Sequence, residues 1–393
     1  MMAMRPLTLV GIIVSIVTGV ILGVAFHVHT RDHTPAGAAA TLSQALRQVS
    51  NSYVEEVSEA ELLEYAVDGM MRGLDAHSDF LNKADFRALE ATTSGRFGGV
   101  GIELGLVDGY FVVVAPIDGT PAARAGILSG DRITALDGEP VRGWQLTDII
   151  DKLRGEPGSA VAMRVYREAD DESMVFDIER AVIEVASVRS RMLEPGYGYI
   201  RISQFQNATG SDVAEALFTM NDSPSGPLRG LVLDLRNNPG GTLQSSVEVV
   251  DHFLNKGLIV YTEGRLKSSH AKYRASRGDL LEGMPLVVLI NGGSASASEI
   301  VAGALQDHGR ATLVGTTSYG KGSVQSVLPL DDDKALKLTT AYYFTPSGRS
   351  IHETGIDPDV NMDGSENDLL DEAVVVLKQA GRETLQARLD TAR

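Results

Sequence analysis

The stretch Asn291–Glu299, N-G-G-S-A-S-A-S-E, decides how the rest of the sequence is interpreted. It follows Pro285–Ile290, an apolar run typical of a buried strand, and precedes Ile300–Asp307, whose apolar spacing suits a helix. Three serines therefore stand where a strand turns into a helix, near free backbone N–H groups and the positive end of a helix dipole. Such a position can hold an alkoxide or an oxyanion. Ser296 with Glu299 also fits a capping box, so a purely structural serine is the alternative.

A second stretch, Gly320–Gln325 (G-K-G-S-V-Q), places a lysine between glycines and between two apolar runs, Ala311–Gly315 and Val324–Leu330. The glycines permit tight turns and close approach of the backbone. A lysine held there away from water is favoured as the neutral amine, which a serine nucleophile needs as its general base. The two stretches together indicate a Ser-Lys pair, Ser296 with Lys321.

These stretches resemble the carboxyl-terminal processing peptidases, PDZ-containing serine proteases of peptidase family S41 with a Ser-Lys dyad. Further blocks follow in the family's order: Asp234–Gly241, Gln306–Arg310, Thr345–Ile351 and Gly355–Val360. The resemblance runs from about residue 41 to the end of the chain. It implies an α/β multidomain protein with a protease core of the ClpP/crotonase-like kind.

The resemblance also implies the catalytic residues. The middle serine of S-A-S-A-S, Ser296, matches the family's nucleophile and is preferred over Ser294 and Ser298. Lys321 is the general base. Gln325 matches a glutamine that orients the lysine, and on a strand it would share one face with Lys321. A solvent-facing strand residue is the alternative for Gln325.

An oxyanion hole built from backbone N–H groups completes the predicted site. Ala297 follows the nucleophile and supplies one N–H group. The turn Asn238-Pro-Gly-Gly241, between a predicted strand and a predicted helix, offers the second through Gly240 or Gly241, and the choice between them stays open. An ordinary turn is the alternative. No metal and no other cofactor is expected.

Residues 119–138, G-T-P-A-A-R-A-G-I-L-S-G-D-R-I-T-A-L-D-G, resemble a bacterial PDZ domain, which we place at 97–181. An exposed strand, 101–104, would accept an extended peptide, and the glycine-containing loop 98–101 would bind its terminal carboxylate. A pocket between that strand and a helix at 145–153 would take an apolar last side chain. The predicted substrate-binding residues are Gly99, Val100, Gly101, Ile102, Leu104, Ile149 and Leu153. Any of Ile102, Leu104, Ile149 and Leu153 could instead belong to the domain core.

Composition and length frame these predictions. The chain has 393 residues and a net charge of -17, which argues against nucleic acid, and it has no cysteine for disulfide or thiolate chemistry. Alternating strand and helix patterns after residue 187 favour a largely parallel sheet. We divide the chain into residues 1–40 (membrane anchor or signal, and tether), 41–96 (helical arm), 97–181 (PDZ domain), 182–365 (protease core) and 366–393 (C-terminal helix).

The first segment decides the expected location. Leu7–Phe26 has no charge and matches a membrane-spanning helix of ~20 residues, with Arg5 on the cytoplasmic side. We therefore expect an uncleaved anchor in the inner membrane and a periplasmic or extracytoplasmic body. The alternative is a signal peptide cleaved near Pro35–Ala40, followed by export. The resemblance implies a homodimer through the helical arm, and an activating adaptor protein stays open.

Two rival functions remain. Gly315–Lys321 nearly forms a phosphate-binding loop, but Gly322 replaces the Ser or Thr that would bind magnesium, and a strand is expected next. A PDZ peptide-binding scaffold with an inactive protease core is the second rival. Ser296, Lys321 and Gln325 are all present, which favours an endopeptidase that processes exposed carboxyl-terminal tails.

Overall fold

The computed structural model describes residues 35–222, 226–276, 278–330 and 334–391. The chain forms two compact units, one holding the described residues up to Phe80 with Val327–Leu338, and the other Leu81–Ser326 with the residues from Thr339 onward. The predicted membrane segment, Leu7–Phe26, lies outside the described residues. Among the helices that the structure does describe, none combines the length and the apolar character that crossing a membrane requires.

The helical arm begins with α2 (Pro35–Ser52) and α3 (Glu59–Arg72). α2 starts at Pro35, earlier than the predicted residue 41, because alanines and other good helix formers follow directly. The sequence S-x-x-E at Ser58–Glu61 forms a capping box before α3: the N–H of Ser58 donates to Glu61 (3.0 Å), and the N–H of Glu61 donates to the Ser58 hydroxyl (3.2 Å). In the other unit, α4 (Lys83–Ser94) ends at Gly95.

The predicted PDZ domain forms an antiparallel sheet in the order β3-β4-β5-β7-β8, closed around an apolar core by α5 and α6. The short strand β2 (Arg96–Gly99) precedes this sheet in the chain and pairs with β9 (Ala181–Glu184), which follows it. The elements are β3 (Ile102–Val107), β4 (Tyr110–Pro116), α5 (Pro121–Ala125), β5 (Arg132–Leu136), β6 (Glu139–Pro140), α6 (Leu146–Leu153), β7 (Ala160–Arg167) and β8 (Glu172–Glu179).

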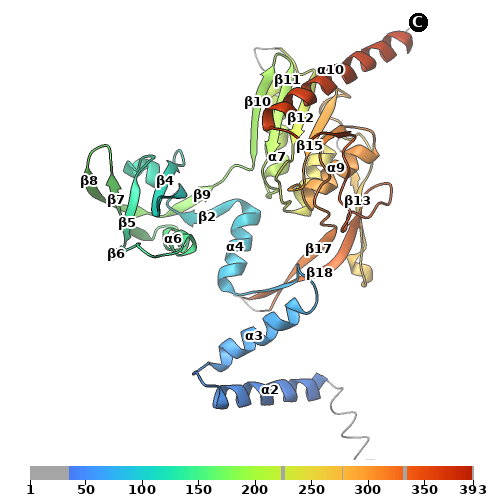
Figure 1. Cartoon of the computed structure of the whole chain (residues 1–393). Coiled ribbons are helices and arrows are strands. Elements are labelled where there is room, and N and C mark those ends of the chain that lie inside the picture. Colours follow the sequence, from blue (N-terminus) through green and yellow to red (C-terminus); the bar gives the residue numbers. More distant parts are fainter. Residues whose placement is uncertain (1–34, 223–225, 277, 331–333, 392–393) are drawn as a thin grey trace, which may run out of the picture. The chain divides into compact units, whose positions relative to one another are not determined.

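The core sheet has the order β10-β11-β12-β15-β16-β19, in which only the pair β10–β11 is antiparallel, so the predicted largely parallel sheet is confirmed. α10 covers one face, and α7, α8 and α9 cover the other (Figure 1). Because both faces are covered, every residue of β12 and β15 is buried. The elements are β10 (Val188–Glu194), β11 (Tyr197–Ile202), α7 (Thr209–Asn221), β12 (Gly230–Asp234), α8 (Leu243–Asp251), β15 (Leu286–Ile290), α9 (Ala297–Asp307), β16 (Thr312–Gly315), β19 (Val360–Asn361) and α10 (Glu366–Thr391).

A second sheet has the order β1-β18-β13-β14, with β17 paired to β18. Its members are β1 (Asp79–Leu81), β13 (Gly257–Glu263), β14 (Ala271–Ala275), β17 (Ser323–Pro329) and β18 (Ala335–Phe344). The polar, basic composition of residues 263–283 favours a mobile loop, and this expectation is wrong, because β14 and a 3-10 turn, η1 (Lys267–Ser269), lie within the segment. The exposure of β14 alternates, with Lys272 and Arg274 outward and Tyr273 packed against the core.

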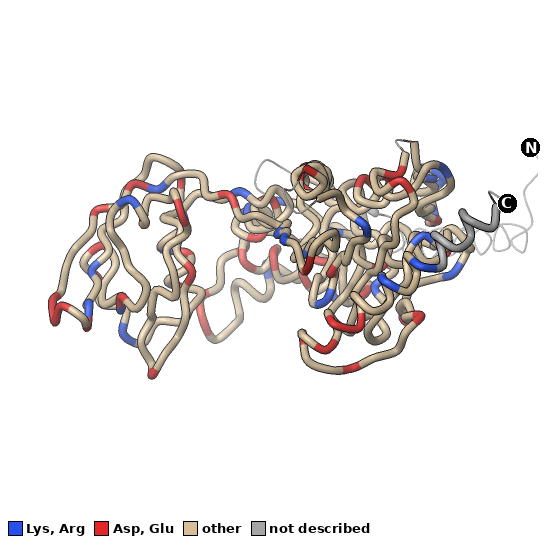
Figure 2. The backbone as a smooth tube through the Cα atoms, turned by 90° about the horizontal axis from the view of Figure 1, so that it is seen from above, with Lys and Arg blue, Asp and Glu red and all other residues tan. Residues whose placement is uncertain are grey.

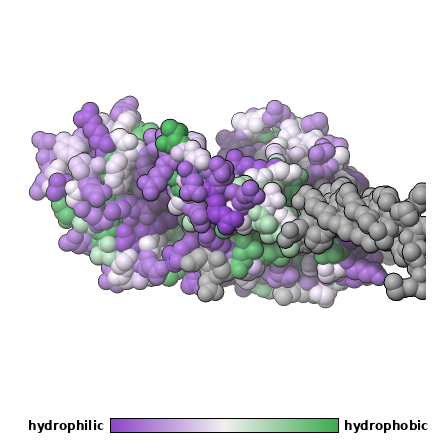
Figure 3. All heavy atoms as spheres, turned by 90° about the horizontal axis from the view of Figure 1, so that it is seen from below, coloured by the Kyte–Doolittle hydropathy of each residue, from purple (hydrophilic) through white to green (hydrophobic). Residues whose placement is uncertain are grey.

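Charged and apolar residues are both spread over the surface. Lys and Arg are interspersed with Asp and Glu along the described backbone (Figure 2). The face shown in Figure 3 is largely hydrophilic, with small hydrophobic patches between the polar residues. The charge of the chain is therefore an excess of acidic groups dispersed among basic ones.

Candidate active site

Three loops meet at the carboxyl edge of the parallel strands, where such sheets commonly bind ligands. They follow β12 (residues 235–241), β15 (291–296) and β16 (316–322). The N–H of Ala295 donates to the carbonyl of Asn238 (2.9 Å), and the N–H of Tyr319 donates to the carbonyl of Ser294 (3.0 Å). These bonds join the predicted nucleophile loop to the predicted oxyanion loop and to the lysine loop.

Ser296 stands at the N-cap of α9 with φ 57° and ψ -114°, in the left-handed range that non-glycine residues rarely adopt. Its backbone N–H donates to Oε2 of Glu299 (2.7 Å), while its carbonyl accepts the N–H of Glu299 (2.9 Å). The backbone of Ser296 therefore makes these contacts with the helix, and its hydroxyl makes neither of them. A strained residue at a strand-to-helix turn is typical of a presented nucleophile.

The two neighbouring serines differ from Ser296. Ser294 and Ser298 are fully buried. The hydroxyl of Ser294 donates to the carbonyl of Leu235 (2.8 Å), and that of Ser298 donates to the carbonyl of Asn238 (2.9 Å). Both hydroxyls thus hold the loop after β12 in place, whereas Ser296 is partly exposed.

Glu299 joins the serine loop to the lysine loop, a role that the sequence reasoning missed. Its side chain is fully buried, and Oε1 accepts the hydroxyl of Ser318 (2.6 Å) and the N–H of Gly320 (2.6 Å). Oε2 accepts the N–H of Lys321 (2.8 Å) in addition to that of Ser296. The sequence signal was the spacing S-x-x-E, which the capping-box interpretation explained only in part.

Tyr343 of β18 is a second residue that the sequence reasoning missed. Its hydroxyl donates to the carbonyl of Lys321 and also lies within hydrogen-bonding reach of Ser296. The side chain is 3% exposed, and burial raises its pKa far above the ordinary value. Tyr343 therefore stays a neutral phenol beside the two predicted catalytic residues.

Gln325 lies on β17, where a strand was expected, on the same face as Ser323. Its amide donates to the hydroxyl of Ser323 (2.8 Å) and, more weakly, to that of Thr339 (3.4 Å). These bonds fix the amide group on the strand that follows Lys321. Its role in orienting the lysine stays a prediction.

The glycines of the predicted oxyanion turn lie against the nucleophile. A side-chain carbon on Gly240 (φ 104°) would lie 2.7 Å from Cβ of Ser296 and 3.0 Å from the nitrogen of Ala297. The N–H of Gly240 donates to Oδ1 of Asn238 (2.9 Å). No hydrogen bond from the N–H of Gly241 or of Ala297 is found among the described residues.

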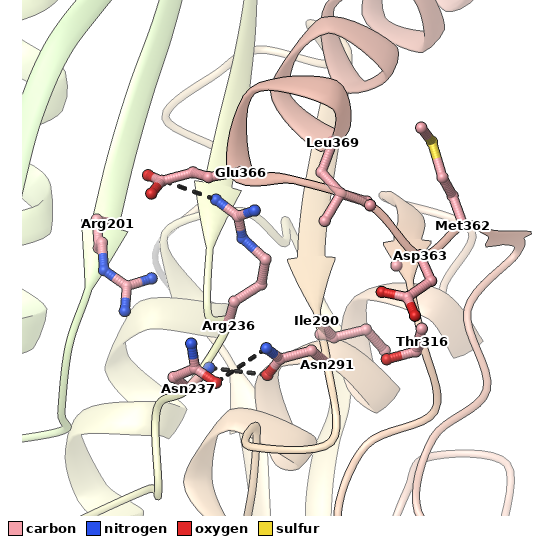
Figure 4. A pocket seen from close by; sticks show the side chains of 12 residues that line it. Arg201, Arg236, Asn237, Ile290, Asn291, Thr316, Met362, Asp363, Glu366 and Leu369 are labelled. Atoms are coloured by element: carbon pink, nitrogen blue, oxygen red, sulfur yellow. Dashed lines mark hydrogen bonds and ion pairs between the residues drawn. The ribbon is translucent and has the colours of Figure 1, made fainter.

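A pocket of about 310 Å³ opens at the same edge of the sheet, under the start of α10 (Figure 4). Buried Asp234 accepts hydrogen bonds from Tyr199 (2.8 Å) and from Arg236 (2.9 and 2.6 Å), and it pairs with Arg201 (3.2 Å). Burial, with the charge of Asp234, raises the pKa of Tyr199 to about 12. This network anchors the strand end from which the oxyanion turn departs.

At the floor of that pocket, two asparagines join the oxyanion loop to the nucleophile loop. The N–H of Asn237 donates to Oδ1 of Asn291 (2.8 Å), and Nδ2 of Asn291 donates to Oδ1 of Asn237 (2.9 Å) (Figure 4). The D-L-R-N-N segment of the sequence is thus part of the scaffold of the site.

The predicted PDZ groove contains a cavity of about 190 Å³. Of the predicted residues, Gly99, Val100, Gly101, Ile102, Leu104 and Leu153 line it. Ile149 does not, because it is fully buried in the domain core, and the adjacent Ile150 lines the cavity instead. The prediction is wrong by one residue along α6, and consecutive side chains of a helix point about 100° apart around its axis.

Comparison with known proteins agrees with this architecture. The family model for peptidase family S41 matches residues 196–362, and that for a PDZ domain matches residues 112–167. The chain is 45% identical over 322 residues to the carboxy-terminal-processing protease of Bartonella bacilliformis, covering 82% of this chain and 74% of that protein. It is 36% identical over 323 residues to the carboxy-terminal processing protease CtpB of Bacillus subtilis, covering 81% and 66%.

Among solved structures, the photosystem II D1 C-terminal processing protease is similar, with 30% sequence identity, 82% and 92% coverage and a TM-score of 0.48. The domains and the sequence matches define a PDZ-containing serine peptidase that acts on peptides or proteins. The chain belongs to the carboxy-terminal processing proteases of peptidase family S41.

Proposed function

We propose that the chain is a serine endopeptidase that processes exposed carboxyl-terminal tails of exported proteins with a Ser296–Lys321 dyad, assisted by Gln325. The observation that carries the proposal is the arrangement around Glu299, which binds the backbone N–H groups of both dyad residues. The different surroundings of the three serines support Ser296 as the nucleophile. A core of the ClpP/crotonase-like kind is part of the same proposal.

In this mechanism Oγ of Ser296 attacks the scissile carbonyl carbon while the neutral amine of Lys321 takes the hydroxyl proton. The C–N bond then breaks, and the leaving amine receives that proton from Lys321. The same lysine then takes a proton from water, whose oxygen attacks the acyl carbon; the bond from that carbon to Oγ breaks, and the lysine returns the proton to Oγ of Ser296. The N–H groups of Ala297 and Gly241 hold the oxyanion, Gly241 being preferred because the N–H of Gly240 is bound to Asn238.

The PDZ domain would select substrates by their free carboxyl terminus. Within the domain, the carbonyl of Val100 accepts a hydrogen bond from the N–H of Ala122, and that of Gly101 accepts one from the N–H of Ile117 (both 2.9 Å). No hydrogen bond from the N–H of Gly101 is found among the described residues, so this group supports binding of a carboxylate. An adaptor that activates the enzyme would act on the same groove or on the core.

Location and assembly complete the proposal. Leu7–Phe26 would anchor the enzyme in the inner membrane, with the described residues on the periplasmic or extracytoplasmic side, or it would be removed as a signal. The first unit carries large exposed apolar side chains, which a second copy in a homodimer would cover. They are Tyr53 (55% exposed), Val54 (89%), Tyr65 (64%), Met70 (55%) and Leu74 (63%).

The test compares the wild-type chain with Ser296→Ala and Lys321→Ala variants on an unfolded protein that ends in an apolar residue, with its terminus free or amidated. We expect both variants to lose cleavage and amidation to slow the wild-type enzyme. Cleavage by the Ser296→Ala protein would overturn the nucleophile. A wild-type chain that binds the free tail and never cleaves would favour the scaffold with an inactive core.

A further inference from the structure

The groove of the PDZ domain continues beyond its cavity along β3. β3 is the first strand of its sheet, so one backbone edge has no neighbouring strand among the described residues. Ile102 and Leu104 line the cavity, and Leu106 is the next residue on the same face of the strand. Leu106 is not part of the cavity and is 60% exposed. A large apolar side chain therefore extends this wall of the groove into solvent.

The opposite wall, α6, extends in the same way. Leu153 and Ile150 line the cavity, and Leu146 lies one turn before Ile150 on the same helix face and is 40% exposed. Leu153 is next to the loop that would bind the carboxylate, because Gly99 bridges to Arg154. From Leu153 the helix reaches back about 10 Å to Leu146 at 1.5 Å per residue. Four residues of β3 cover a similar length, about 13 Å.

The direction of a bound tail follows from these walls. With its carboxylate at Gly99–Gly101, a tail pairs antiparallel with β3, and its last residue (position 0) lies opposite Ile102. Positions -2 and -4 then lie opposite Leu104 and Leu106. Side chains of directly opposed residues point to the same face, so positions 0, -2 and -4 all face α6.

We propose that the PDZ domain selects tails that are apolar at three alternating positions, 0, -2 and -4. The cavity takes position 0, and a shelf made by Leu106 and Leu146 takes the side chains of positions -2 and -4, with Leu106 contacting position -4. The shelf rests on the proposed recognition of free tails and names the class of tail: an extended, alternately apolar terminus, of the kind that a folded protein keeps buried.

The experiment uses the full chain carrying Ser296→Ala, so that no peptide is cut, and fluorescein-labelled octapeptides in anisotropy titrations. The peptides are identical except for leucine or serine at position -4 and for a free or amidated terminus. We expect serine at position -4 to raise Kd by about 5–10-fold, the effect of removing a partly buried leucine contact. Adding Leu106→Ser should weaken the leucine peptide alone, so that the two peptides bind equally. Leu128→Ser is the matched control, because Leu128 is 50% exposed in the turn before β5, outside both groove walls.

The outcomes separate the shelf from tail recognition itself. If the free terminus binds more tightly than the amidated one but leucine and serine at position -4 bind equally, the shelf is wrong and tail recognition stands. A preference for leucine that survives Leu106→Ser also overturns the role of Leu106. If amidation has no effect or no peptide binds, the proposed recognition of tails fails, and the shelf fails with it.

Discussion

Ser296 and Lys321 share one partner atom: Oε2 of Glu299 accepts the N–H of Ser296 at 2.7 Å and that of Lys321 at 2.8 Å. The other oxygen of the carboxylate binds Ser318 and Gly320 in the lysine loop. Four donors thus satisfy the two oxygens of a fully buried carboxyl group. This side chain therefore helps to fix the relative position of the proposed nucleophile and base.

Glu299→Gln should disrupt that arrangement, because an amide offers one acceptor oxygen and turns an NH₂ group toward backbone donors. We expect a loss of stability of about 2 kcal/mol or more, and a fall in cleavage of at least about 100-fold. Urea unfolding and a cleavage assay measure the two effects. The matched control is Glu353→Gln, because the side chain of Glu353 is 86% exposed. A Glu299→Gln enzyme as active as the control would contradict the role of Glu299.

Alanine at each of the three serines should separate chemistry from structure. Ser294→Ala and Ser298→Ala remove hydroxyls that satisfy buried carbonyls, so each should lower the unfolding free energy by about 1–3 kcal/mol. The molecules of either variant that remain folded should still cleave the substrate. Ser296→Ala should abolish cleavage with a smaller change in stability. Denaturant unfolding and cleavage at low temperature distinguish the three. Persistent cleavage by Ser296→Ala combined with inactive Ser298→Ala would reassign the nucleophile.

Gly240→Ala should stop catalysis for a steric reason, since the new carbon would lie 2.7 Å from Cβ of Ser296. We expect it to lose more stability than the roughly 1–2 kcal/mol that a positive φ alone costs an alanine. Gly143→Ala isolates that conformational cost, because Gly143 has φ +90° and no atom within 4 Å of the added carbon. Equal losses of stability in the two variants would show that the turn has room beside Ser296.

Tyr343→Phe should slow cleavage, by about 10-fold, through loss of a hydrogen bond that holds Lys321. Because the pKa of Tyr343 is far above its ordinary value, the phenol stays neutral in the working range and titrates no catalytic step. The pH at which cleavage reaches half of its maximum should therefore be unchanged in the variant. A shift of that pH would show that Tyr343 exchanges protons with the site.

The burial of Tyr199 beside Asp234 should make the stability of the folded chain depend on pH at high pH. The pKa of Tyr199 is raised to about 12 in the folded chain, against 10.0 as its ordinary value. The folded state therefore holds its proton longer than the unfolded state, so this contribution is present in full below pH 10 and is lost as the pH rises toward 12. Tyr199→Phe should remove that part of the decline in the unfolding free energy between these pH values. If the unfolding free energies of the wild-type chain and the variant fell equally over this pH range, Tyr199 would make no such contribution.

Much of this architecture can be read from local patterns. The apolar runs predicted the strands β12, β15 and β16. The S-A-S-A-S-E and G-K-G segments lie in loops at one edge of the sheet, because these parallel strands all end at that edge. Strand β14 was not predicted, because its alternation of exposed and packed residues is short and lies in a polar, basic segment. The spacing of apolar residues predicts long periodic elements. It does not predict a short strand such as β14, which forms by pairing with β13.

The residues missed at the site are those whose role comes from contacts distant in sequence. Glu299 reaches Gly320 and Lys321 across more than twenty residues, and Tyr343 reaches Lys321 across 22. Their local patterns, a helix cap and a strand aromatic, have ordinary explanations. Ile149 and Ile150 show the same limit on a smaller scale, because only the packing of α6 decides which one faces the groove.

The most direct test of the central claim is labelling by a fluorophosphonate, a reagent that reacts with activated serine hydroxyls, followed by peptide mass spectrometry of the full chain. The account predicts a single labelled serine, Ser296, with labelling lost in Ser296→Ala and strongly slowed in Lys321→Ala, while Ser294→Ala and Ser298→Ala still react at Ser296. Labelling of another serine, or an unchanged rate in Lys321→Ala, would contradict the Ser296–Lys321 dyad.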